Sequence, residues 1–420
     1  MTLCIRNARH LDAPVDLLVA DGRIVTMTPA GHQAPPDGCE LFEAGGLRLL
    51  PSLADAHVHL REPGYEYKED IASGLDAAAH GGFGQVMCMA NTRPVNDTAS
   101  VTRFMLERAR QSHPRGPRLF PVAAASVGLE GAALAPLAEL HEAGCVAVSN
   151  DGRPLENAEL VRRIMEYAAD LGMVFIDHCE DPRLARGWLM HEGDVSGMLG
   201  VKGQPAAGEA IQAARDIMLA EYLGLPVHIA HVSSRLTVDI IAWGKARGVR
   251  VTAETCPHYL LLDETSLQGY NAQAKVSPPL RTADDRAALR EAVASGLVDI
   301  LVTDHAPHAA HEKDETLDAA PCGFTGLDLA LSLTWGLVRE GALGEADLHR
   351  LWSRRPAEIF GLPWNGFAPG DPADFFLFDA DAAWTVTPES LRSRGKNTPF
   401  LGVEVQGRVR HHWLGGVRLF

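Results

Sequence analysis

Residues 53–64 read LADAHVHLREPG, an apolar run that ends on two histidines one residue apart. Side chains on a β-strand alternate between its two faces, so His57 and His59 point the same way if this run is a strand. An HxH pair alone is weak evidence for a metal site, because such histidines are often simply hydrogen-bonded or exposed. Its interpretation depends on what the rest of the chain places beside it.

This run belongs to the first of eight short apolar segments that end in polar residues, namely RLLPSLADAHVH, GQVMCMAN, PRLFPVAAAS, CVAVSND, MVFIDH, PVHIAH, RVTAET and VDILVTD. Between them lie alanine-rich stretches with apolar residues at three- and four-residue spacing and a glycine near the end, which is typical of amphipathic helices. Eight strands that alternate with helices predict an α/β fold, a (β/α)₈ TIM barrel.

The two ends of the chain have a different texture, with short apolar runs separated by turn residues. We predict that residues 1–49 and 363–420 form one small β-rich domain, and that residues 50–362 form the barrel. Two unrelated appendages are the alternative.

Composition limits the functions that are open to this chain. Its 420 residues are 46% hydrophobic and carry a formal net charge of −16, which opposes binding to nucleic acid or to a membrane surface. The seven cysteines include no CxxC pair, and no run has the length of a signal peptide or a membrane span, so we expect a reduced, cytoplasmic protein. A small anionic substrate stays open, because arginines and metal ions can reverse the local field.

In a TIM barrel the active site lies where the strands end. There the chain places four histidines and two aspartates, namely His57, His59, Asp151, His178, His231 and Asp304. Each has an ordinary alternative when taken alone: Asp151 could form an Asx turn before Gly152, and Asp304 could cap a helix or turn. Six such residues at the ends of five strands predict a metal site.

Imidazole and carboxylate ligands without thiolate suit Zn²⁺, with Mn²⁺ or Co²⁺ as substitutes. Six ligands exceed one tetrahedral shell, so we predict two zinc ions that share the carboxylate of Asp151. Two such ions lower the pKa of a bound water to roughly 7, which favours hydrolysis of an amide-like carbon or its reverse. We predict that Asp304 is both a ligand and the base that passes a proton to the leaving nitrogen.

Eight motifs together resemble dihydroorotase of the bacterial class I type, a family of the amidohydrolase superfamily: DAHVHLREPG, MANTRPVND, SNDG, HCED, HIAHVSS, TAETCPHYLLL, SPPLR and VTDHAPH. The resemblance runs from about Leu50 to Gly326. It implies a distorted barrel with a small β-domain from both termini, and two zinc ions. It also implies interconversion of N-carbamoyl-L-aspartate and L-dihydroorotate in pyrimidine synthesis.

A substrate of this kind carries a carboxylate, which the Arg61 guanidinium can bind with two parallel hydrogen bonds and Asn91 with an amide donor. A surface salt bridge from Arg61 to Glu62 or Glu66 is the alternative. The resemblance implies further contacts, including Ser277 where the family usually has asparagine, and backbone contacts beside the flexible region 306–322. The predicted substrate-binding residues are His59, Arg61, Asn91, Ser277, His308, Cys322 and Gly323.

Two other functions stay open. Hydantoinases and allantoinases share the HxH pair but typically bridge their metals with a carboxylated lysine on the fourth strand, and CVAVSND has no lysine. A non-catalytic scaffold for aspartate carbamoyltransferase would resemble the enzyme without its metal ligands, which this chain retains. Aspartate carbamoyltransferase and a second copy of this chain are the macromolecular partners that we consider.

Overall fold

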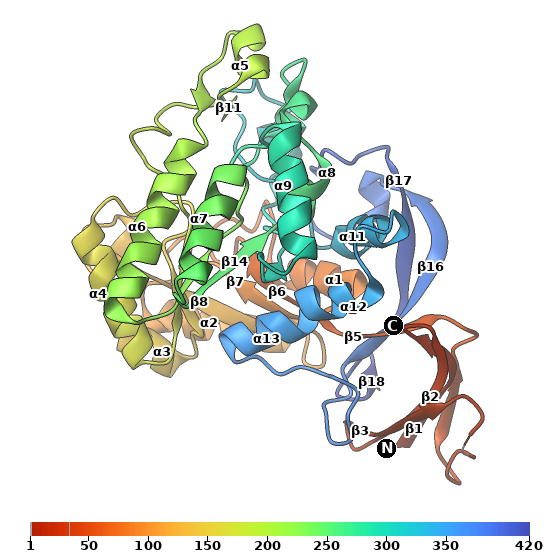
Figure 1. The fold of residues 1–420 in the computed structure, drawn as a ribbon. Helices are drawn as coiled ribbons and strands as arrows, with labels where there is room; N and C mark the ends of the chain where they lie inside the picture. The colour runs from red at the N-terminus through yellow and green to blue at the C-terminus, as the bar shows by residue number, and fades with distance from the viewer. Residues whose placement is uncertain (1, 33) are drawn as a thin grey trace.

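The computed structural model describes residues 2–32 and 34–420, which form a helix-covered barrel and a separate β-sheet beside it (Figure 1). No described helix combines the length and the apolar composition that a bilayer-crossing segment needs.

The barrel is built from eight parallel strands that pair in the order of the sequence. They are β6 (Leu53–Val58), β7 (Phe83–Cys88), β8 (Arg118–Ala124), β9 (Ala147–Ser149), β10 (Val174–Asp177), β13 (Val227–Ile229), β14 (Val251–Thr255) and β15 (Ile300–Leu301). A parallel bridge between Val58 and His305 joins the last strand to the first. The predicted (β/α)₈ barrel is therefore confirmed.

Helices cover the outside of this barrel (Figure 1). The longer ones are α1 (Ile71–Gly81), α2 (Ala99–Ser112), α3 (Leu137–Ala143), α4 (Ala158–Asp170), α6 (Ala207–Leu223), α7 (Arg235–Ala246), α9 (Ala283–Ala294) and α11 (Ala330–Arg339). Their ends follow the expected chemistry: Asp70 caps α1 by accepting from the backbone N–H of Ser73, and Gly82 ends it with a φ of 89°.

Shorter elements decorate the loops between strands and helices. They are α5 (Asp194–Leu199), α8 (Pro257–Leu261), α10 (Ala310–Lys313), α12 (Glu345–His349), α13 (Arg355–Phe360), a π-helical turn at Arg350–Arg354, and 3₁₀ turns at Val127–Leu129, Glu264–Leu267, Ala272–Ala274 and Pro388–Ser390. Strands β11 (Met190–His191) and β12 (Gly203–Gln204) pair in the loop after β10.

The second sheet is made from both ends of the chain. Its strands are β1 (Thr2–His10), β2 (Ala13–Ala20), β3 (Arg23–Pro29), β4 (Glu40–Glu43), β5 (Arg48–Pro51), β16 (Phe375–Thr385), β17 (Glu404–Leu414) and β18 (Val417–Arg418). Strand β16 pairs antiparallel with β5, so the two termini share one sheet, over a core that includes Ile5, Leu17, Phe375 and Trp413. The joined β-rich domain is confirmed, and the alternative of two unrelated appendages is wrong.

One expected strand is divided in the structure. The run from Arg48 to His59 was expected to be a single barrel strand, yet residues 48–51 pair with β16 and only β6 enters the barrel. The change falls at Ser52, whose backbone N–H donates to Asp374 O (3.0 Å), while that of Leu53 donates to Gly82 O (2.9 Å).

Candidate active site

The six residues expected to bind metal lie together at the carboxyl ends of five barrel strands. His57 is in β6 and His59 follows it, while the others follow β9, β10, β13 and β15. All six side chains are buried, with none more than 7% exposed. Residues that are up to 247 positions apart thus meet because parallel strands of one barrel end on the same side.

Asp151 lies between two sets of imidazoles. The possible ligand atoms of His57, His59 and Asp151 lie within 4.8 Å of one another, as do those of Asp151, His178 and His231. Its Oδ1 is 3.3 Å from His57 Nε2 and 3.4 Å from both His178 Nδ1 and His231 Nε2, while its Oδ2 is 3.5 Å from His59 Nε2. The carboxylate faces these imidazoles, so the alternative of a simple Asx turn is wrong.

Two of the imidazoles have one nitrogen fixed and the other directed toward a carboxylate. His57 Nδ1 lies 2.7 Å from Glu254 Oε1, and His59 Nδ1 lies 2.8 Å from Asn91 Oδ1. His57 Nε2 is buried and has no hydrogen-bond partner among the described residues. A ring nitrogen without a partner, opposite a nitrogen held by an acceptor, is what a metal-binding histidine requires, so this donor set fits a metal.

The site also favours ionised carboxylates. Burial raises the pKa of Asp151, but the charge of His57 and hydrogen bonds from His178 and His231 outweigh it and hold the pKa well below its usual range. Burial likewise raises the pKa of Asp304, yet the hydrogen bond from His59 and the charge of His57 lower it overall. Both groups are therefore charged at neutral pH and can bind a cation.

Asp304 faces the first set of imidazoles, with its Oδ1 3.1 Å from His59 Nε2 and 3.8 Å from His57 Nε2. It caps no helix in the described part of the chain. Its φ is 47°, and Arg61 and His231 have φ angles of 62° and 28°. Non-glycine residues rarely adopt positive φ, and such strain is concentrated at functional sites.

A pocket of about 280 Å³ opens beside these groups. It is lined by His59, Arg61, Asn91, Asp151, Gly152, His178, Glu180, Trp188, His231, Ser277, Asp304, Ala306, Cys322 and Gly323. Of the expected substrate-binding residues, His308 alone is outside this lining. It lies behind Arg61, with its Nε2 3.5 Å from Arg61 Nη2 and 2.8 Å from Cys322 O.

Arg61 makes neither of the surface salt bridges that were the alternative. Its Nε donates to Pro307 O at 3.2 Å. Glu62 pairs instead with Arg108 at 2.9 Å, and Glu66 accepts from the backbone N–H of Gly64 at 2.8 Å. The guanidinium is therefore directed into the pocket, without a carboxylate partner in residues 2–32 and 34–420.

Sequence reasoning missed several residues that shape the site. Glu254, fully buried in β14, accepts from His57 and also lies 3.0 Å from His228 Nε2. Asn397, far along the chain, accepts from the backbone N–H of His308 (2.9 Å) and donates to Gly323 O (3.0 Å). A carboxylate inside an apolar strand was the available signal for Glu254, whereas nothing around Asn397 indicates its role.

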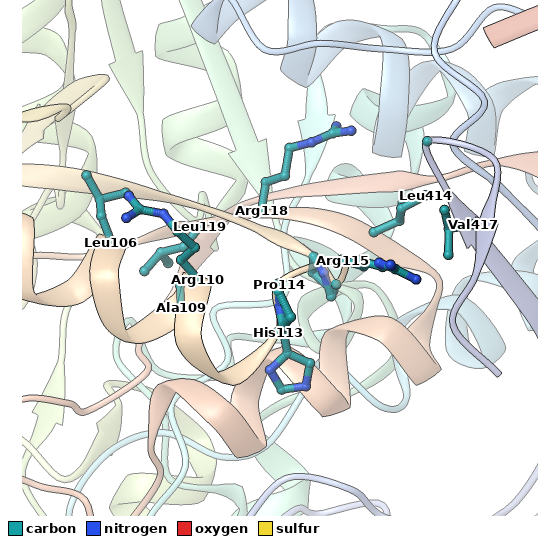
Figure 2. A pocket seen from close by; sticks show the side chains of 13 residues that line it. Leu106, Ala109, Arg110, His113, Pro114, Arg115, Arg118, Leu119, Leu414 and Val417 are labelled. Carbon is teal, nitrogen blue, oxygen red and sulfur yellow. The ribbon is translucent and has the colours of Figure 1, made fainter. Parts of the chain in front are cut away.

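A larger hollow of about 500 Å³ lies between the end of α2 and the turn at Gly415. Figure 2 shows that its cationic side chains, Arg110, Arg115 and Arg118, point in different directions. Arg110 pairs with Glu107 at 2.5 Å, and Arg118 with Asp374 at 2.8 Å. Because these groups do not converge on one point, the smaller pocket at the strand ends is the candidate active site.

A barrel whose strand ends present four imidazoles and two carboxylates around a pocket defines an enzyme of the amidohydrolase class. A family profile described as Dihydro-orotase-like matches residues 46–237. The dihydroorotase of Syntrophus aciditrophicus (strain SB) is 46% identical over 96% of this chain and 94% of its own length, and that of Geobacter metallireducens is 46% identical over 98% and 96%. The chain belongs to the dihydroorotase family.

Solved structures support the fold. The L-hydantoinase (dihydropyrimidinase) of Arthrobacter aurescens superposes with a TM-score of 0.87 over 99% of this chain and 95% of its own, at 23% sequence identity.

Proposed function

We propose that this chain is a dihydroorotase that interconverts N-carbamoyl-L-aspartate and L-dihydroorotate in pyrimidine synthesis. The observation that carries the proposal is the pair of imidazole sets around Asp151, with the guanidinium of Arg61 lining the same pocket. The first element suits hydrolysis of a cyclic amide, and the second suits a substrate with a carboxylate.

The metal centre in this proposal is a pair of zinc ions held by His57, His59, Asp151, His178, His231 and Asp304. When bound, such a pair ionises a water and polarises the amide carbonyl. The chain's own part is to fix the imidazoles, and Glu254 and Asn91 do so at His57 and His59 through the hydrogen bonds described above.

Asp304 is the proposed base. In ring opening, water adds to the amide carbon, the bond to the ring nitrogen breaks, and that nitrogen gains a proton. The lowered pKa of Asp304 means that its carboxylate is ionised. Because Oδ1 faces His59, we propose that Oδ2 accepts the proton of the attacking water. The same oxygen then returns the proton to the leaving nitrogen.

Arg61 and Asn91 are the proposed ligands of the substrate carboxylate, with Ser277, Cys322 and Gly323 along the rest of the ring and His308 supporting Arg61. Because hydrogen bonds to charged groups contribute about 1.5–3 kcal/mol, we expect Arg61→Ala to raise KM for L-dihydroorotate by about 10- to 150-fold. Steady-state kinetics measures this effect. Arg103→Ala, on the exposed side of α2, is the control and should leave KM unchanged. An unchanged KM in the Arg61 variant would place the clamp elsewhere.

The test of the whole proposal is metal content measured together with ring opening of L-dihydroorotate, with hydantoin and allantoin as competing substrates. We expect two zinc ions per chain and turnover of L-dihydroorotate alone. Turnover of hydantoin instead would favour a hydantoinase, although residues 147–149 of the fourth strand, Ala-Val-Ser, offer no lysine to bridge metals. Absence of both bound metal and turnover would favour the non-catalytic scaffold for aspartate carbamoyltransferase. That partner stays a prediction, as does the cytoplasmic location.

For a homodimer, the candidate face that we propose is on α6. Ile211, Met218 and Tyr222 are 55%, 59% and 77% exposed on α6. Neighbouring apolar side chains that are exposed in this way favour association with another protein surface. The neighbouring charges Glu221 and Arg247 form an ion pair at 2.7 Å, so the face is locally neutral in a chain of net charge −16. Two like-charged copies can therefore meet there.

We expect the double variant Met218→Glu, Tyr222→Glu to be monomeric by light scattering after size exclusion, because four carboxylates would face one another across the interface. Leu41→Glu, an equally exposed apolar site on β4, is the control and should stay dimeric. A dimer that survives the double variant uses another face.

A further inference from the structure

Two lysines are buried beside the pocket, and no carboxylate in the described part of the chain pairs with either. Lys275 and Lys313 are 5% and 2% exposed, whereas lysines are almost never fully buried unless they are paired. Within residues 2–32 and 34–420, neither ammonium group forms an ion pair. Burying a charge in this way is unfavourable unless other polar groups compensate for the lost water.

Backbone carbonyls supply that compensation. Lys275 Nζ donates to Leu317 O at 2.6 Å and to Ala320 O at 2.7 Å. Lys313 Nζ donates to Pro321 O at 2.9 Å, to Gly323 O at 3.1 Å and to Lys275 O at 3.4 Å, so each of its three protons has an acceptor. Burial lowers the pKa of Lys313 to about 8, which still leaves the group largely protonated at neutral pH.

Most of the carbonyls that these lysines bind belong to the segment that leads into one wall of the active-site pocket. Cys322 and Gly323 line the pocket, and the segment from 314 to 323 contains no helix or strand that could fix its backbone. Gly323 is closely packed in this wall. Its φ is 110°, and a Cβ at this position would lie only 2.6 Å from the Cβ of Ala306.

The lysine contacts also set which way the peptide groups of this wall face. In a planar trans peptide the C=O and the next N–H point in opposite directions. With Pro321 O turned toward Lys313, the N–H of Cys322 is turned away from that lysine, and it donates to no acceptor in the described part of the chain. It is therefore free to donate to a polar group of a molecule in the pocket.

We propose that Lys275 and Lys313 are positioning residues, which hold the backbone of residues 317–323 from behind and so aim the Cys322 N–H at the substrate ring. The identity of that ring rests on the proposed function. The role of the lysines in ordering this segment does not.

The test compares Lys313→Met and Lys275→Met with the wild-type metal-loaded enzyme, because methionine keeps much of the side-chain bulk without donors or charge. Hydrogen exchange should be slow at the amides of Ala319, Ala320 and Gly323, which donate to Thr316 O, Thr316 O and Lys275 O. It should be about tenfold faster or more at these amides in each variant. KM for L-dihydroorotate should rise about tenfold or more, while kcat changes less, since the metal ligands are untouched.

Lys245→Met is the matched control. Lys245 Nζ also donates to a backbone carbonyl, Leu297 O at 2.8 Å, and pairs with Asp299 at 2.6 Å, but it lies at the opposite end of the barrel. The Lys245→Met variant should have a lower Tm than the wild type. Its hydrogen exchange in residues 317–323 and its KM for L-dihydroorotate should be unchanged.

Three results would overturn the proposal: fast exchange of the Ala319, Ala320 and Gly323 amides in the wild type, unchanged exchange there in a folded lysine variant, or an equal KM change in Lys245→Met. The wild-type measurement applies even where a variant does not fold. Exchange needs no substrate, so a wild-type enzyme that fails to open L-dihydroorotate would contradict the proposed function without deciding the role of the lysines.

Discussion

Asp304→Asn is expected to fold like the wild type and to lose about 10²- to 10⁴-fold in kcat for ring opening, the usual contribution of a positioned acid or base. Asparagine keeps the size of the side chain and one oxygen near His59 Nε2, but it cannot accept a proton and return it to the leaving nitrogen. KM should change much less than kcat, because the expected ligands of the substrate carboxylate are intact. Steady-state kinetics with metal analysis measures both effects.

Asp299→Asn is a matched control at the opposite end of β15, the strand that Asp304 follows. Asp299 precedes β15, where it pairs with Lys245 at 2.6 Å and with Arg355 at 2.8 Å. Its loss should lower stability and leave kcat near the wild-type value, which separates a weakened barrel from a missing base. A near-wild-type rate in Asp304→Asn would remove Asp304 as the proton carrier.

Asp151→Ala is expected to have the second large effect, a loss of bound metal. The carboxylate lies within 3.5 Å of a nitrogen from each of four histidines, so its removal takes a ligand from both imidazole sets at once. Changes outside the ligand shell already weaken metal binding by about 10- to 100-fold, and losing a shared ligand should weaken it by more than about 100-fold. Metal content after dialysis and ring-opening activity should fall together.

The control for this variant is Asp170→Ala, which removes an exposed carboxylate at the end of α4. It should retain the wild-type metal content. If Asp151→Ala keeps two ions per chain under the same dialysis, the carboxylate does not bridge them. Circular dichroism on both variants shows whether the barrel is intact.

The barrel could be predicted from the sequence because each strand is a short apolar run with a polar residue where it ends. The division of the first run at Ser52 could not be predicted, since residues 48–51 are drawn into the second sheet by β16, more than 300 positions away. No local pattern distinguishes a strand that pairs with its neighbour from one that pairs with the far end of the chain.

The metal-binding candidates could be predicted because histidine and aspartate at strand ends are unusual. The groups that support them have no such signal. Glu254 occupies one position of a strand whose side chains alternate between two faces, so its position alone does not show which face it takes. Lys275 and Lys313 resemble ordinary surface lysines until their burial is known. Their roles depend on partners that the fold alone brings near.

Asn397 bears on how the enzyme is made in the cell. The residue that hydrogen-bonds to both His308 and Gly323 emerges from the ribosome after the whole barrel, and β17 follows it. A nascent chain released before this point lacks a support for the pocket wall and leaves β16 without β17, one of its two neighbouring strands. Premature termination should therefore yield an inactive product with an open sheet edge, which proteases can clear, and not a partly working enzyme.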